Sequence, residues 1–156
     1  MIRGEAMQID GGCECGKVRY RLHGPPIFVN CCHCRQCQKL GGSAFALNAM
    51  IEADRVEHLS EPETVAIEAN GAARCRECKT LLWGLHPMFG DRIRFLRAGT
   101  LDEGERLPPD AHFFVRSKHS WVVLPDGVPC FETLPGEGDP PLLSAEAAAR
   151  IEAARG

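Results

Sequence analysis

The sequence has no long apolar run, no excess of charge of one sign and no internal repeat. Residues 1–12 contain charges and glycines instead of the apolar stretch of a signal peptide, and no later segment approaches the roughly 20 apolar residues that cross a bilayer. The net charge is -3 over 156 residues, which gives no basic surface for nucleic acid or for an anionic membrane. We therefore expect a cytoplasmic protein that binds neither partner.

Helical periodicity is also scarce before the C-terminus, whereas short runs of alternating apolar and polar residues are common. Val18, Tyr20 and Leu22 alternate with basic residues, which predicts a half-buried strand that ends before Gly24. A hairpin-like return through residues 27–29 is expected to follow it. The remaining expected strands cover residues 44–50, 64–69, 81–85, 92–96, 112–115 and 121–124. The pattern predicts a mainly β fold.

Two helices are expected. Ser144 can cap a run of Ala, Glu, Arg and Ile that reaches Arg155, and a shorter helical turn over residues 34–40 would stop at Gly41 and Gly42. The length suits one domain. We assign residues 1–10 to an N-terminal lead-in, 11–132 to the zinc-binding domain, and 133–156 to a linker and the C-terminal helix.

Eight of the nine cysteines fall into three tight clusters. They are Cys13 and Cys15, then Cys31, Cys32, Cys34 and Cys37, then Cys75 and Cys78. Thiolates separated by one or two residues can face one ion, and a reducing compartment disfavours disulfides. The odd number of cysteines also argues against a simple disulfide framework. The clusters therefore predict metal binding, with two Zn2+ ions per chain as the simplest account.

The first predicted zinc site uses Cys13, Cys15, Cys75 and Cys78, which complete a tetrahedral shell of four sulfurs. Because its two halves are far apart in the sequence, the ion would tie distant hairpins together and act structurally. A redox-active C-x-x-C pair and an iron-sulfur centre are the alternatives.

The second predicted site uses Cys32, Cys34 and Cys37, and three protein ligands leave a fourth position for water or substrate. Cys31 or His33 could close that position, but neighbouring side chains of an extended segment point to opposite faces. The sequence therefore allows two alternatives for the second site, one with an open fourth position and one in which a protein ligand closes it. An open site with three cysteinates favours delivery of a thiolate over hydrolysis, because zinc deprotonates an incoming thiol and three cysteinates weaken its Lewis acidity.

Several segments resemble the glutathione-dependent formaldehyde-activating enzyme (GFA) family, which also includes centromere protein V. They are residues 12–20 (GCECGKVRY), 32–39 (CHCRQCQK), 42–45 (GSAF), 75–78 (CREC), 99–102 (GTLD) and 112–121 (HFFVRSKHSW). The resemblance runs from about residue 11 to residue 131, with seven cysteines in register.

The resemblance implies a β-tent fold with a structural zinc on the first set of four cysteines. It also implies a second, catalytic zinc on Cys32, Cys34 and Cys37. The activity it implies is that of a carbon-sulfur lyase, which adds the thiol of glutathione to formaldehyde and gives S-hydroxymethylglutathione. The alternative function is a non-enzymatic zinc-binding interaction module with two closed structural sites. A third is a redox-sensing thiol protein in which Cys31 joins a disulfide.

The chain departs from the family pattern at two positions. Lys79 follows the last structural cysteine where the family usually has glycine, so the lysine would strain a left-handed turn or force another one. Cys31 is an additional thiol beside the second site.

The residues that would bind the carboxylates of a thiol ligand are not fixed by the sequence. The cationic candidates are Arg35, Lys39, His112, Arg116, Lys118 and His119. On a simple strand they would instead line a solvated face, with Phe113, Val115 and Trp121 packed inward. The lone Cys130 is expected to be a small core residue.

Overall fold

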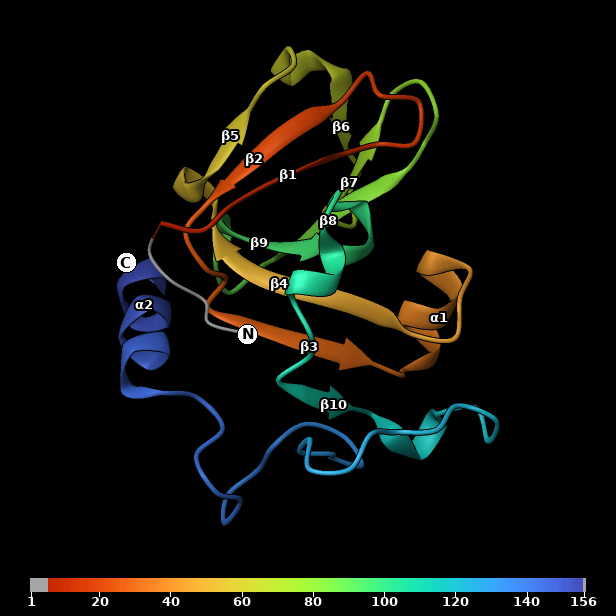
Figure 1. Cartoon of the computed structure of the whole chain (residues 1–156), viewed down its shortest axis with the longest axis vertical. Coiled ribbons are helices and arrows are strands. Elements are labelled where there is room, and N and C mark those ends of the chain that lie inside the picture. Colours follow the sequence, from red (N-terminus) through yellow and green to blue (C-terminus); the bar gives the residue numbers. More distant parts are fainter. Residues whose placement is uncertain (1–5, 156) are drawn as a thin grey trace.

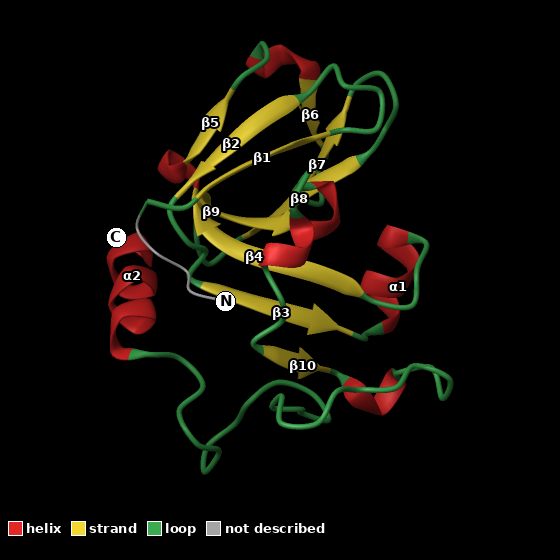
Figure 2. Cartoon of the chain, in the orientation of Figure 1, coloured by secondary structure: helices red, strands yellow, loops and turns green. Residues whose placement is uncertain are grey.

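The computed structural model describes residues 6–155, which fold into two β-sheets with helices at their edges (Figures 1 and 2). The larger sheet has seven strands in the order β10-β3-β4-β9-β8-β7-β6. Its strands are β3 Phe28–Cys32, β4 Ala46–Glu52, β6 Val65–Ile67, β7 Ala72–Cys75, β8 Leu81–His86, β9 Gly90–Arg97 and β10 Ala111–Phe113. All neighbours are antiparallel except β10, which runs parallel to β3.

The smaller sheet is antiparallel and has the order β1-β2-β5. It consists of β1 Gln8–Gly12, β2 Arg19–His23 and β5 Val56–His58. Along β2, Tyr20 and Leu22 are buried while Arg21 is half-buried and bonds twice to Asp10 at 2.7 and 3.0 Å. The alternation therefore gives this sheet one face for the core and one for solvent.

The main core lies between the two sheets. Ile9, Tyr20 and Leu22 of the small sheet belong to one buried apolar cluster with Ile51 and Leu96 of the large sheet. Burying each such side chain contributes about 1.5–3 kcal/mol, so packing between the sheets is a large contribution to the stability of the fold.

The two α-helices lie at opposite ends of strands β3 and β4 (Figure 1). Helix α1 spans Arg35–Gly41 and helix α2 spans Ala145–Arg155. Helix α2 starts where Ser144 Oγ accepts a hydrogen bond from the Ala147 amide at 3.1 Å. Its Arg150 bonds to both carboxylate oxygens of Glu52 at 2.7 and 2.6 Å, which fixes the helix to the large sheet.

Five single turns of 3-10 helix complete the described structure. They are η1 Ala53–Arg55, η2 Pro62–Thr64, η3 Ala98–Thr100, η4 Gly104–Arg106 and η5 Val115–Ser117. Within residues 6–155, no helix combines the length and apolar character needed to cross a bilayer.

The mainly β fold with a short C-terminal helix is confirmed, and so is the short helix before Gly42. Two local expectations are wrong. Residues 27–29 do not form a hairpin with β2, because β3 pairs with β4 and β10 instead. Residues 121–124 form no strand, and the Trp121 side chain is 72% exposed rather than packed inward. The alternation pattern of the sequence does not predict strands β1, β5 and β7.

Candidate metal centres

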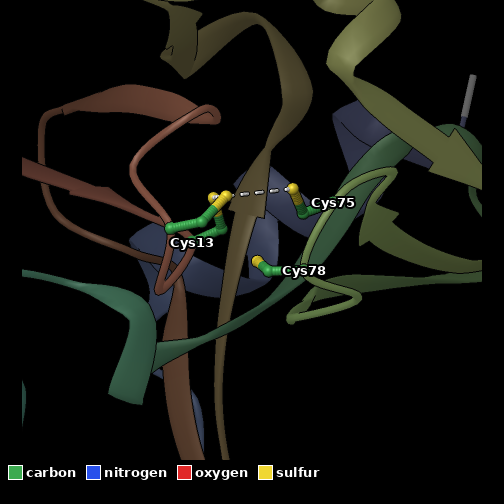
Figure 3. A group of neighbouring side chains, drawn as sticks. Cys13, Cys75 and Cys78 are labelled. Atoms are coloured by element: carbon green, nitrogen blue, oxygen red, sulfur yellow. Dashed lines mark hydrogen bonds between the residues drawn. The ribbon is translucent and has the colours of Figure 1, made fainter.

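The first cysteine centre brings together Cys13, Cys15, Cys75 and Cys78, whose sulfurs all lie within 4.8 Å of one another. Figure 3 shows the side chains of Cys13, Cys75 and Cys78 turned toward one another. The Sγ atoms of Cys13 and Cys15 are 3.5 Å apart, and those of Cys15 and Cys75 are 3.8 Å apart. A zinc ion with bonds of roughly 2.3 Å separates tetrahedral sulfurs by about 3.8 Å. The four side chains thus fit a zinc ion.

Two tight turns from different sheets place these thiols. Cys13 and Cys15 lie in the turn between β1 and β2, while Cys75 ends β7 and Cys78 lies in the turn before β8. The first turn needs Gly16, whose φ of 80° favours a residue without Cβ. The centre therefore joins the small sheet to the large one.

The turn after Cys78 keeps its left-handed shape with lysine in place of glycine. Lys79 has a φ of 65°, and its amide donates to the Cys75 carbonyl at 3.0 Å. The lysine therefore retains the turn at the cost of strain that glycine would avoid. Beside it, hydrogen bonds from the side chain and backbone of Thr80 lower the pKa of the Cys78 thiol to about 5, which favours the thiolate that a metal requires.

The second cysteine centre consists of Cys32, Cys34 and Cys37, whose sulfurs also lie within 4.8 Å of one another. Cys32 ends β3, and Cys34 caps helix α1 by accepting a hydrogen bond from the Cys37 amide at 3.3 Å. No other Cys, His, Asp or Glu of residues 6–155 joins this group. Its three sulfurs could hold a metal ion and leave one position for an outside ligand.

Cys31 and His33 lie apart from this group, because consecutive residues of the extended chain face opposite sides. Within the centre, hydrogen bonding to Cys32 and the nearby Arg97 guanidinium lower the pKa of the Cys37 thiol to about 6, while the same bond raises that of Cys32. The Cys37 thiol therefore ionises more readily than the Cys32 thiol, and a bound metal would deprotonate both.

A third group was missed by sequence reasoning. Cys31, His33 and His112 are all buried, and their donor atoms lie within 4.8 Å of one another. Burial raises the pKa of the Cys31 thiol to about 12, and burial, then His112 and Lys118, lower the pKa of His33 to about 4. Burial also lowers the pKa of His112, so all three side chains are uncharged at neutral pH. Only the pairing of β10 with β3 brings His112 to this place, and sequence alone does not reveal that pairing.

A cavity of about 560 Å3 is lined by residues that follow each cysteine centre in the sequence, and by residues of β9 and η3. It is lined by Leu40, Gly41, Ser43, Phe45, Ala46, Leu47, Arg74, Lys79, Thr80, Leu81, Arg97 and Gly99. The lining includes three cations and no carboxylate, together with several apolar side chains. Arg97 connects the cavity to the second centre, and its Nε and Nη1 have no hydrogen-bond partner within residues 6–155. Arg97 is not among the residues predicted from the sequence, because it lies just before the segment 99–102 and outside the cysteine clusters.

The cations predicted to bind carboxylates are divided by the fold. Arg35, Lys39 and His119 line a shallow pocket together with Trp121, whose ring stacks on His119 at 5.5 Å between centroids. The others do not belong to that pocket. Lys118 donates to the carbonyls of His119 and Val122, His112 is buried, and Arg116 lies in η5. Cys130 is exposed rather than a core residue.

Comparisons with known proteins relate this sequence to one described family. The family described as "Glutathione-dependent formaldehyde-activating enzyme" matches residues 8–117. A Halomonas elongata protein named "Putative glutathione-dependent formaldehyde-activating enzyme" is 29% identical over 128 residues, which cover 76% of this chain and 82% of that protein. A Rhodobacter sphaeroides protein of known crystal structure is 16% identical and covers 60% of this chain and 88% of that one, with a TM-score of 0.46. Since the family match spans well over half of its length, the chain belongs to the glutathione-dependent formaldehyde-activating enzyme family.

Proposed function

We propose that the protein is a zinc-dependent carbon-sulfur lyase that adds the thiol of glutathione to formaldehyde, giving S-hydroxymethylglutathione, and that catalyses the reverse cleavage. The observation that carries this proposal is the second centre, where three cysteines gather without a fourth protein ligand among residues 6–155. Membership of the family supports the choice of the two substrates. The first centre would hold a second, structural zinc ion.

In the proposed reaction, the sulfur of glutathione forms a bond to the formaldehyde carbon and the carbonyl π bond breaks. The proton released by the thiol ends on the new hydroxyl group, so no oxidant or reductant is needed. A zinc ion held by Cys32, Cys34 and Cys37 would supply the ionisation of the thiol at neutral pH. The three cysteines themselves bind and orient, and they are not consumed.

The cavity beside the second centre suits a tripeptide thiol with two carboxylates. Arg74, Lys79 and Arg97 line the cavity and provide positive charge that would attract a carboxylate. Phe45 and Leu47 line the same space and would exclude water from the bound ligand. We therefore propose that Arg97 positions glutathione with its sulfur toward Cys37.

The rate of adduct formation tests the reaction. Formaldehyde labelled with carbon-13 is mixed with glutathione, and exchange spectroscopy by NMR measures the rate above the uncatalysed background. The zinc-loaded wild type should accelerate exchange, Cys34→Ser should return it to background, and Cys130→Ser should match the wild type as an exposed-thiol control. A wild type with full metal content and no acceleration would contradict the enzyme and favour the interaction module.

The same assay tests the cavity. Arg97→Gln removes one charge-assisted hydrogen bond, so the KM for glutathione should rise by about tenfold or more. Cysteamine, a thiol without a carboxylate, should be handled equally by both proteins. Arg92→Gln, on the same strand but outside the cavity, serves as the matched control.

A further inference from the structure

The group formed by Cys31, His33 and His112 has the composition and spacing of a metal site. The Cys31 sulfur is 3.6 Å from His33 Nε2, which is 3.1 Å from His112 Nδ1. The three residues are 2%, 0% and 5% exposed. One thiol and two imidazoles are therefore enclosed together, away from solvent and from the second centre.

The strand register brings the three side chains to one face. His112 of β10 is the direct partner of Cys31 on β3, and partners across two strands project to the same side. His33 is two residues beyond Cys31 and shares that side, whereas Cys32 projects to the other. The backbone of His33 is fixed, since its amide donates to the Phe113 carbonyl at 2.9 Å and its carbonyl accepts from Gln38 Nε2 at 2.8 Å.

The spacing of the donors matches a coordination tetrahedron. With bonds of about 2.0–2.1 Å to nitrogen and about 2.3 Å to sulfur, tetrahedral ligands are separated by about 3.3 Å between nitrogens and about 3.6 Å between sulfur and nitrogen. The observed separations of 3.1 and 3.6 Å are close to these values. An ion could therefore bind with little movement of the side chains.

We propose that Cys31, His33 and His112 form a third metal site, which takes a borderline divalent cation of the Zn2+ class. The donor set contains no oxygen ligand, which argues against Ca2+ and Mg2+. On binding, the Cys31 sulfur exchanges its proton for the metal and the proton leaves to solvent, while both imidazoles bind uncharged. Because the site is buried, it would brace β10 against β3 rather than accept a substrate.

Metal stoichiometry of the full chain tests the site. Apoprotein kept under reducing conditions is titrated with Zn2+, and bound metal per chain is measured by native mass spectrometry. The wild type should saturate at three ions, while Cys31→Ser and His112→Gln should each saturate at two. Cys130→Ser removes an exposed thiol outside every cluster and should keep three.

Cobalt provides a second readout. The difference in absorption between Co2+-loaded wild type and Cys31→Ser should show the signature of a single thiolate with imidazole ligands. If either variant fails to fold, the number of ions bound per wild-type chain is the test, and saturation at three supports the third site. Saturation of the wild type at two or fewer ions, or equal metal content in the wild type and both folded variants, would overturn it.

Discussion

The two cysteine centres predicted from the sequence differ in how far apart along the chain their ligands lie. The first takes its ligands from two turns in two different sheets, with Cys15 and Cys75 60 positions apart. The second takes its three ligands from the end of β3 and the start of helix α1, all within six residues. The first centre thus joins distant parts of the chain, whereas the second lies at one end of the large sheet and uses a single short segment.

Because the two centres close loops of different length, we expect the first to contribute mainly to stability and the second mainly to chemistry. An ion that closes a long loop restricts the unfolded chain strongly, whereas an ion that closes a short loop restricts it little. We therefore expect that the fold would remain intact if an ion in the local centre exchanged its ligands. The closed centre between the sheets has four sulfurs and is suited to hold its ion permanently.

The largest effect is expected from Cys13→Ser. Loss of the first ion reopens a loop of about 60 positions, which in the chain-entropy model costs roughly 4 kcal/mol of unfolding free energy. Urea unfolding of the zinc-loaded proteins measures this change. A variant that loses one ion but unfolds at the wild-type midpoint would show that the first centre does not brace the two sheets.

Cys34→Ser should have a smaller effect on stability and a larger one on activity. The loop it reopens is about six positions long, so the expected cost is about 2 kcal/mol, and serine can still cap helix α1. The same urea experiment, combined with metal analysis, measures both quantities. Equal destabilisation by Cys13→Ser and Cys34→Ser would remove the contrast between the centres.

Lys79→Gly sharpens the account of the first centre. The left-handed conformation of Lys79 is unfavourable for a residue with a Cβ, so glycine should stabilise the protein by up to about 1 kcal/mol. Thermal unfolding at saturating zinc measures the gain. A loss of stability would mean that the Lys79 ammonium, which donates to the Arg76 carbonyl at 2.5 Å, outweighs the strain.

The smallest effect concerns a second connection between the sheets. His58 of β5 accepts a hydrogen bond from Arg94 Nη2 of β9 at 3.2 Å, and Arg94 lies over the Trp83 ring at 4.3 Å. Burial, and then the Arg94 charge, lower the pKa of His58 below its ordinary 6.5. The unfolded chain therefore binds the His58 proton more readily than the folded protein does.

Stability from His58 is thus complete above pH 6.5 and declines as the pH falls through the lowered pKa. His58→Gln should reduce this acid sensitivity when urea unfolding is compared at pH 7.5 and pH 5.5. His23→Gln, which removes a histidine paired with Glu57 on the exposed side of the small sheet, is the control. An unchanged pH dependence in His58→Gln would show that His58 is not responsible.

Much of the architecture follows from local sequence signals. The cap at Ser144 and the glycines after residue 40 define both helices, and the alternation around Tyr20 defines the core face of β2. Cysteine spacing also predicts that Cys32, Cys34 and Cys37 lie together, because a spacing of two or three positions already constrains where the sulfurs can point.

The remainder depends on contacts between distant segments. The pairing of β10 with β3 buries His112, which a simple strand pattern would have left on a solvated face. Trp121 shows the converse, since an apolar residue in a strand-like run is exposed beyond the sheet. Arg97 acquires its position only when β9 packs beside β4 and reaches the cavity near Cys37. Local periodicity does not encode which strands become neighbours.

The most direct test is whether an outside thiol binds the ion of the second centre. With zinc in the first centre and in the group of Cys31, His33 and His112, and with cobalt in the second centre, sulfur-to-cobalt absorption is recorded as glutathione is added. We predict a rise of roughly one third as a fourth sulfur joins three cysteinates, with no change in Cys34→Ser. An unchanged wild-type spectrum at saturating glutathione would contradict an open centre that receives a substrate thiol.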